Sequence, residues 1–379
     1  MKITYIAPSK IPSTTANSIQ VMKVCQALTQ LGHETHLFVP GNQSQPWSEM
    51  EEQYGVHTPF QIAWLPAHHI TRKLDFAWAA VRQAKRNHSD VVYTRLLWAA
   101  IFALRHKLPV ILEMHEVPSG RFAPRLYRHY LSLPGKRLTV FITRALQIEI
   151  EKSLSVRHLP AEALIAPDGV DLERFDGLPA APAAREALGF PEATTAVYSG
   201  GFYPGRGLEI LFDLAVAFPQ QRFLWIGGQL TVMKEWHTKV KAGGLTNVTL
   251  TGFIPNQKLP LYLACADVLL MPYCLQVAGS SGGDIASVTS PMKLFEYMAC
   301  GRAILCSDLP VLHEILNTAN ALFYPPDDLP AMKIAFSRLL QEPQLCSSLG
   351  HQARQDVIKF SWKVRMQTIL EHFSAQFME

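Results

Sequence analysis

The sequence has few features of a disulfide-bonded, membrane-spanning or disordered protein. Its six cysteines form no C-x-x-C pair and mostly lie in apolar runs, which is typical of buried thiols in a reducing compartment. No apolar run approaches the ~20 residues that cross a bilayer, and the apolar part of the N-terminus is too short for a signal peptide. Charged residues make up only 17% of the chain, and a net charge of +4 does not by itself indicate nucleic acid. We therefore expect a folded cytoplasmic protein that binds no nucleic acid.

The sequence also lacks the glycine-rich motif that binds a nicotinamide cofactor. The first expected strand, Lys2–Pro8, is not followed by G-x-G-x-x-G, which excludes a nicotinamide dehydrogenase. What the chain does contain is 48% hydrophobic residues, enough for two domains with substantial cores. An amphipathic helix, Ser18–Leu31, follows the first strand and leads to a second strand at His36–Val39. This βαβ unit, and a second alternation later in the chain, predict an α/β fold.

Hydrophobic periodicity and turn residues place the remaining elements. Strands are expected at 90–93, 109–114, 195–199, 223–226, 268–272 and 302–306, helices at 74–86, 95–104, 208–218, 259–265, 329–341 and 360–373, and loops or surface connections at 43–60, 178–191 and 273–289.

The stretch 290–301, SPMKLFEYMACG, has the pattern of a helix that begins at an anion site. Ser290 is expected to cap the helix, and Pro291 fits its first turn. Free N–H groups followed at once by Lys293 could bind a diphosphate, and Glu296 could accept hydrogen bonds from sugar hydroxyls. The alternative is an ordinary packed helix with a lysine and a glutamate on its surface.

The run SPMKLFEYMACGRAILCSDLPVLHEIL resembles the donor-site signature of retaining glycosyltransferases of family 4, which have the GT-B fold. The linker sequence LIAPDGVDLERF and the terminal SWKVRM resemble the same family, so the resemblance covers the chain from end to end. It implies two Rossmann-like domains facing each other across a cleft, with the C-terminal helix crossing back to the N-terminal domain. With the boundary near Pro167, the acceptor-side domain would comprise 1–166 and 358–379, and the donor-binding domain 167–357.

The resemblance also implies a donor site in the second domain. The helix start would hold the donor diphosphate, and Glu296 would hold the ribose. The Gly-rich loop after strand 195–199 would let the backbone approach the diphosphate, while Arg206 offers a bidentate partner for phosphate oxygens. A later strand and turn would pack against the base through backbone atoms. The expected donor-binding residues are Gly200, Gly201, Arg206, Phe253, Ile254, Ser290, Pro291, Met292, Lys293, Leu294 and Glu296.

The acceptor side would lie at the carboxyl ends of the strands in the first domain. His115 and Glu116 follow strand 109–114, and in similar sequences this histidine lies against the transferred sugar. A neutral imidazole there would donate a hydrogen bond to the sugar; the alternative is a purely structural histidine. In the first loop, Asn17 and Ser18 would offer side-chain hydrogen bonds, or one of them would only cap the helix.

Two positions depart from the family pattern. Val288 stands where many members carry a second glutamate, and Gly200 stands where an arginine is common. Lys293 is interpreted as compensating for that missing cation. These departures, together with the absence of the Gly-rich turn that the family usually carries in its first loop, support an alternative function, a catalytically silent GT-B-like binding or scaffold subunit. The retained residues argue against it: His115, Arg206, Lys293 and Glu296.

The expected function is retaining, hexosyltransferase-like transfer from a UDP- or GDP-linked sugar to a sugar, lipid-linked or small-molecule acceptor. The sequence contains no Asp-x-Asp pair to hold a metal. We therefore expect neither metal nor cofactor beyond the nucleotide sugar, and assign the catalytic roles to His115, Arg206 and Lys293.

The segment 120–144 is the most basic part of the chain, with tyrosines and leucines interleaved among its arginines. Its first interpretation is a solvated face or a groove for an anionic acceptor. The second is peripheral contact with an anionic membrane at the inner membrane surface.

Overall fold

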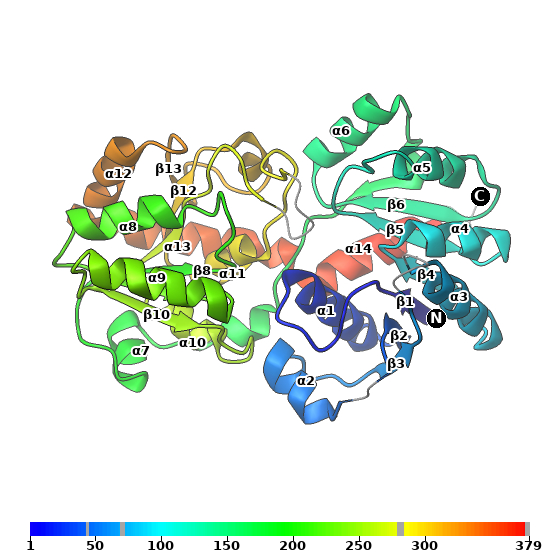
Figure 1. Cartoon of the computed structure of the whole chain (residues 1–379), viewed down its shortest axis with the longest axis horizontal. Coiled ribbons are helices and arrows are strands. Elements are labelled where there is room, and N and C mark those ends of the chain that lie inside the picture. Colours follow the sequence, from blue (N-terminus) through cyan, green and yellow to red (C-terminus); the bar gives the residue numbers. More distant parts are fainter. Residues whose placement is uncertain (43–44, 69–72, 279–283, 376–379) are drawn as a thin grey trace. The chain divides into compact units, whose positions relative to one another are not determined.

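The computed structural model describes residues 1–42, 45–68, 73–278 and 284–375 and divides the chain into two compact units (Figure 1). Unit 1 comprises Met1–Gly169 with Trp362–Glu379, and unit 2 comprises Val170–Ser361. Each unit is a parallel sheet with helices packed on it, so the predicted α/β class is confirmed.

The sheet of unit 1 has seven strands in the order β3-β2-β1-β4-β5-β6-β7, and every pair is parallel. In the register, Ile3 of β1 lies opposite both Thr35 and Val91. The strand order reverses between β1 and β4, which is where open α/β sheets bind ligands at their carboxyl edge. The strands are β1 (Lys2–Ile6), β2 (Glu34–Pro40), β3 (Gln61–Leu65), β4 (Val91–Thr94), β5 (Val110–Met114), β6 (Arg137–Phe141) and β7 (Ala163–Ile165).

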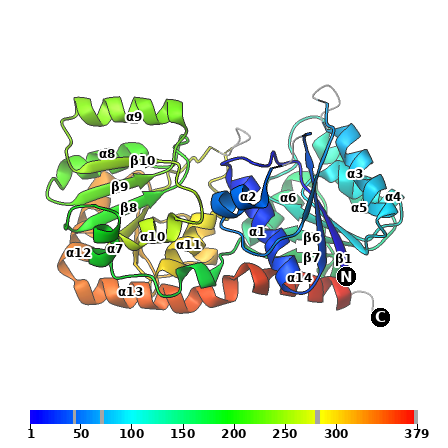
Figure 2. The same ribbon diagram turned by 90° about the horizontal axis from the view of Figure 1, so that it is seen from below.

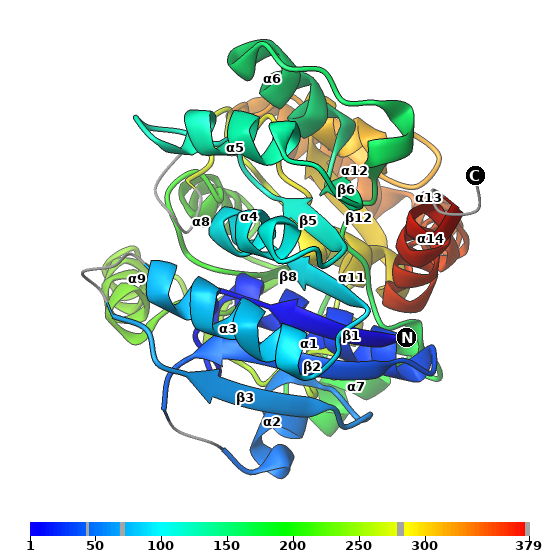
Figure 3. The same ribbon diagram turned by 90° about the vertical axis from the view of Figure 1, so that its right-hand side faces the viewer.

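The C-terminal helix belongs to unit 1, as the sequence predicted, and packs on α1 and β6 (Figure 3). Its buried apolar side chains include Trp362 and Met366. The predicted loop at 43–60 contains a short helix instead, because Met50 and Tyr54, one turn apart, are buried in a polar stretch; residues 43–44 lie outside the described part. The helices are α1 (Ala16–Gln30), α2 (Trp47–Tyr54), α3 (Leu74–Arg86), α4 (Leu97–Arg105), α5 (Ala123–Ser132), α6 (Arg144–Leu154) and α14 (Trp362–Ala375), with a 3-10 turn at Pro160–Glu162.

Unit 2 has six parallel strands in the order β10-β9-β8-β11-β12-β13, which reverses between β8 and β11. Its core joins the sheet to its helices, with Trp225 and Phe223 of β9 fully buried beside Phe336. The strands are β8 (Thr195–Ser199), β9 (Arg222–Ile226), β10 (Val248–Gly252), β11 (Val268–Met271), β12 (Ala303–Ser307) and β13 (Leu322–Tyr324).

The helices of unit 2 cover both faces of this sheet, with α9 on one side and α13 on the other (Figure 2). The predicted surface connection at 178–191 contains a helix with Ala184 and Arg185 buried, because an Ala-rich segment packs closely despite its prolines. The helices are α7 (Ala181–Ala187), α8 (Leu208–Ala217), α9 (Leu230–Ala242), α10 (Leu259–Ala264), α11 (Met292–Cys300), α12 (Leu329–Gln341) and α13 (Pro343–Asp356), with 3-10 turns at Leu172–Phe175, Pro310–Glu314 and Val357–Phe360.

Two further expectations concern the membrane and the thiols. In the part of the chain that the structure describes, no helix combines the length and apolar character needed to cross a bilayer. All six cysteines are free thiols, and Cys25, Cys265 and Cys306 are buried.

Candidate active site

The Gly-rich loop between β8 and α8 packs so closely on its surroundings that its glycines cannot be replaced. A Cβ atom on Gly205 would lie 1.9 Å from the backbone oxygen of Gln276, and one on Gly207 would lie 1.7 Å from that of Pro272. Both glycines also have a left-handed φ, which other residues rarely adopt. The loop is therefore fixed against the segment that follows β11, at the point where the strand order of unit 2 reverses.

Gly200 has a different neighbour, the amine of Lys293. A Cβ atom on Gly200 would lie 2.6 Å from Lys293 Nζ. The amine thus occupies space beside the backbone that a side chain at position 200 would need. This contact gives a physical reason why a glycine and a lysine occur together here.

The Lys293 amine is buried and has no hydrogen-bonding partner in the described part of the chain. Its Nζ atom is inaccessible and makes no hydrogen bond to any described residue. It lies 4.0 Å from the ring centroid of Tyr198 and 5.1 Å from that of Tyr273. Burial, and then the charge of Arg206, lower the pKa of Lys293 well below its ordinary value. An anion at this point would supply both a partner and the opposite charge.

The guanidinium of Arg206 and the amine of Lys293 both lie close to the ring of Tyr273. It donates a hydrogen bond to the Tyr273 hydroxyl, and its guanidinium carbon lies 4.7 Å from the ring centroid. Its Nε–H group is buried and has no acceptor among the described residues. Two cations are therefore held on one aromatic ring, and a doubly charged anion would relieve their repulsion.

The helix α11 begins one residue later than predicted. Its N-cap position is Pro291, and no side chain caps the helix. The predicted N-cap position, Ser290, therefore lies one residue before the observed one. The first turn begins with Met292 and Lys293, where backbone N–H groups point out of the helix start, and Leu294 N–H donates to the oxygen of Pro291 at 2.9 Å.

Glu296 is half-buried, one turn into α11, beside Asn256. The Asn256 amide lies 3.5 Å from a Glu296 carboxylate oxygen, and Arg174 donates to the Asn256 oxygen at 2.7 Å. Phe253 is 39% exposed and Ile254 is half-buried in the turn that precedes Asn256. The sequence analysis did not single out Asn256 or Arg174, because only folding brings them to the glutamate.

The segment before α11 holds no carboxylate at the position of the second family glutamate. Val288 occupies it and is 5% exposed. Asp284 accepts hydrogen bonds from the N–H groups of Ala286 at 3.0 Å and Val277 at 2.9 Å, and these bonds lower its pKa. Asp284 thus fixes the described part of the predicted loop 273–289; residues 279–283 lie outside that part.

In unit 1, the first loop is organised by Thr15. Its hydroxyl accepts a hydrogen bond from the N–H of Ser18 and caps α1, so the expectation that Asn17 or Ser18 caps this helix is wrong. Ser18 is completely buried, and its hydroxyl donates to the backbone oxygens of Ser13 and Thr15. We therefore assign Ser18 to holding the loop, since a buried, satisfied hydroxyl cannot meet an acceptor.

Asn17 instead binds an arginine that the sequence analysis missed. Its side-chain oxygen accepts from Ser9 at 2.9 Å and from Arg95 at 2.6 Å, and Arg95 also contacts Gln20 at 3.3 Å. Arg95 directly follows β4, on the other side of the strand-order reversal from β1. A charged residue immediately after a buried strand was the signal that could have identified it.

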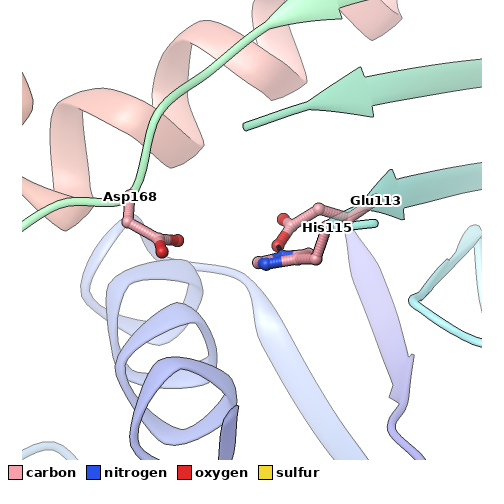
Figure 4. A group of neighbouring side chains, drawn as sticks. All are labelled: Glu113, His115 and Asp168. Atoms are coloured by element: carbon pink, nitrogen blue, oxygen red, sulfur yellow. Dashed lines mark hydrogen bonds and ion pairs between the residues drawn. The ribbon is translucent and has the colours of Figure 1, made fainter. Parts of the chain in front are cut away.

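His115 directly follows the carboxyl end of β5 and is paired with Glu113 of that strand (Figure 4). Its Nε2 atom makes a short hydrogen bond to Glu113. Glu113 is wholly buried and forms an ion pair with Arg365 of α14 at 2.9 Å. Glu116, the second predicted residue, is exposed in the following turn. A glutamate inside the apolar strand VILEM was a signal that the sequence analysis passed over.

Glu113, His115 and Asp168 place one potential metal-ligand atom each within 4.8 Å of one another (Figure 4). Two arginines, Arg95 and Arg365, act on the same group. Their positive charges oppose a cation, and the ion pair with Arg365 already occupies one Glu113 oxygen. We interpret this group as a hydrogen-bonded network of unit 1.

The tyrosines of the basic segment 120–144 face the core of unit 1, so they do not share a surface with its exposed arginines. Tyr127 and Tyr130 are fully buried, and the hydroxyl of Tyr127 lies 2.7 Å from His158 Nε2. The exposed part includes Phe122, which is 60% exposed, with Arg121 and Arg125 close to it in sequence.

The chain is similar to known proteins in both of its units. The chain matches the model for glycosyltransferase family 4 over residues 18–174 and the model for group 1 glycosyl transferases over residues 193–342. It is 22% identical to the phosphatidyl-myo-inositol mannosyltransferase of Mycolicibacterium smegmatis, covering 96% of this chain and 91% of that protein.

Two solved structures share its fold. The Anabaena protein HepE, in complex with UDP and glucose, has a TM-score of 0.75 at 17% identity, covering 99% of this chain and all of that one. The sucrose-phosphate synthase of Thermosynechococcus elongatus has a TM-score of 0.77 at 18% identity, covering both chains completely. Because the two family models match most of each unit and the fold agrees, this chain belongs to the family 4 glycosyltransferases and has the GT-B fold.

Proposed function

We propose that this glycosyltransferase retains the anomeric configuration and uses a UDP- or GDP-linked sugar as its donor. The observation that carries the proposal is the pair of cations on Tyr273. Lys293 Nζ and Arg206 Nε are both buried, and neither has a hydrogen-bonding partner among the described residues. A diphosphate is the anion that fits this pair, because it offers two charged groups to two adjacent donors. The UDP complex of HepE, a protein of the same fold, supports this choice.

The cations and the start of α11 would stabilise the leaving diphosphate without a metal ion. Negative charge grows on the diphosphate as the glycosidic bond breaks, and preorganised donors in a dry site are most effective against such charge. Arg206, Lys293 and the N–H groups after Pro291 are such donors. Glu296 would bind the ribose hydroxyls, with Asn256 beside it.

The acceptor side would be formed in unit 1. His115 would contact the transferred sugar, and Asn17 and Glu116 would bind the acceptor, which is a sugar, a lipid-linked molecule or a small molecule. Arg95, bound to Asn17, adds a positive charge at this edge of the sheet. The leaving phosphate would help to deprotonate the acceptor hydroxyl, which keeps departure and attack on one face of the sugar.

A thermal-shift screen of nucleotide diphosphates and their sugars, followed by turnover of the labelled sugars, tests this function. Arg206→Ala should weaken nucleoside diphosphate binding by ~1.5–3 kcal/mol, the range for hydrogen bonds to charged groups, while the fold persists. Arg338→Ala, on the exposed face of α12, is the matched control. Binding without turnover would establish the silent scaffold instead, and the absence of both would refute a nucleotide-sugar site.

Peripheral contact with an anionic membrane is a separate proposal. It is supported by Phe122, a largely exposed aromatic ring with Arg121 and Arg125 next to it. Flotation with anionic vesicles should carry the protein upward, whereas neutral vesicles should not, and Arg121→Glu with Arg125→Glu should abolish the difference. Equal flotation of the variant would assign this face to solvent.

A further inference from the structure

The network around His115 determines which of its ring nitrogens carries a proton. Glu113 lies in β5 and His115 directly follows this strand, two residues further on, and the two side chains contact each other. Three other side chains reach the same carboxylate. The Gln20 amide donates to one oxygen at 2.6 Å, while the Tyr93 hydroxyl and Arg365 donate to the other. The Glu113 carboxylate is thus held from three further elements and cannot rotate away from the imidazole.

The carboxylate is ionised in this setting. Burial opposes its ionisation, but the Arg365 guanidinium and the imidazole N–H of His115 outweigh burial and hold the pKa of Glu113 well below its ordinary value. An ionised carboxylate only accepts hydrogen bonds. The hydrogen between the two residues therefore resides on His115 Nε2.

The ring of His115 is neutral near neutral pH. Burial, and then the charge of Arg95, lower the pKa of His115 to about 4, although Glu113 acts in the opposite direction. A neutral imidazole with hydrogen on Nε2 has a lone pair on Nδ1. Nδ1 has no hydrogen-bond partner among the described residues, and 17% of the side chain is exposed.

We propose that Glu113 is a positioning residue that makes His115 Nδ1 a hydrogen-bond acceptor for a hydroxyl group of the bound sugar. This inference rests on the proposed function and reverses one expectation from the sequence, in which the imidazole donates to the sugar. A site built to accept from a hydroxyl leaves its acceptor unpaired when that hydroxyl is missing. The geometry thus selects a sugar with a free hydroxyl at this position over its deoxy or fluoro analogue.

Nitrogen NMR of the histidine-labelled protein tests the proton position directly. The chain has fourteen histidines, so the His115 signals are identified by their loss in His115→Asn. The wild-type protein, without substrate, should show a protonated Nε2 and an unprotonated Nδ1 near neutral pH. A protonated Nδ1, or an imidazolium, would overturn the proposal. This NMR measurement requires no turnover, so its outcome does not depend on whether the proposed function is correct.

Two substitutions of His115 then test the role of Nδ1. The amide oxygen of His115→Asn can take the place of Nδ1, whereas the amide of His115→Gln reaches only the place of Nε2, next to Glu113. We expect His115→Asn to keep a kcat about tenfold or more above that of His115→Gln, as the retention of one hydrogen bond implies. The reverse order would overturn the acceptor role.

Glu113→Gln completes the series. Its amide can donate to Nε2, so the imidazole should move its hydrogen to Nδ1, and the change should be visible in the same NMR experiment. Persistence of hydrogen on Nε2 in folded Glu113→Gln would show that Glu113 does not set the tautomer. If this variant fails to fold because Arg365 loses its partner, the wild-type spectrum and the Asn–Gln pair still decide the proposal.

Discussion

Replacement of Lys293 by methionine should increase stability and decrease nucleotide binding in the same protein. The substitution keeps the length of the side chain and removes its charge. In the folded protein the Lys293 amine is buried without a hydrogen-bond partner among the described residues, and burial is the main cause of its lowered pKa. Both effects of the substitution follow from the burial of this one nitrogen atom, Nζ of Lys293.

Two contributions to stability oppose each other. A buried polar group without a partner costs about 1–3 kcal/mol, which the methionine would recover. The attraction of the ammonium to the Tyr198 ring, 4.0 Å away, is worth about 0.5–2 kcal/mol, which the methionine would lose. The first is the larger, so Lys293→Met should raise the free energy of unfolding by about 1 kcal/mol.

The binding effect should be larger and opposite in sign. Loss of one charge-assisted hydrogen bond to a diphosphate costs ~1.5–3 kcal/mol, or roughly 10- to 150-fold in Kd.

Urea unfolding and isothermal titration calorimetry measure the two effects, with Lys234→Met on the exposed side of α9 as the control. The control should change neither quantity appreciably. A Lys293→Met protein that is clearly less stable than the control and binds UDP and GDP with unaltered Kd would refute the reasoning. Lys293 would then be a structural cation that packs on two tyrosines.

Three other substitutions test the remaining parts of the model. Glu296→Gln keeps the shape of the side chain and should weaken nucleoside diphosphate binding by ~1.5–3 kcal/mol in calorimetry; a large fall in Tm with unchanged binding would mark a structural carboxylate. Arg365→Met leaves Glu113 buried without its ion pair, so urea unfolding should show a loss of about 3–5 kcal/mol, against no comparable loss for the exposed Lys363→Met; equal stability of the two variants would contradict this. Burial raises the pKa of Asp168 to about 7, so the folded state binds this proton more tightly than the unfolded state, and stability should fall as pH rises towards 7. Relative to Asp168→Asn, the wild-type protein should lose about 2–3 kcal/mol between about pH 5 and about pH 7, and a difference independent of pH would show that Asp168 does not titrate there.

Features that depend only on residues close together in the sequence were predictable from it. The alternation of strands and helices, the helix that ends at Gly301, and the Gly-rich loop after β8 all follow from local periodicity and from glycine conformations. The family resemblance rests on the same contiguous stretches, and the fold and family are confirmed. The short helices α2 and α7 were missed, because a polar or Ala-Pro-rich composition hides a few buried side chains.

The partners of the site residues were decided only by the tertiary structure. Lys293 meets Gly200, Arg206 meets Tyr273, and Glu113 meets Arg365 across 252 residues of sequence. Periodicity predicts that a residue is buried or exposed, but it carries no information about which distant side chain lies beside it. Parallel strands bring such residues to one edge of a sheet, and the charge and hydrogen-bonding state of each then depend on the neighbours that it acquires there.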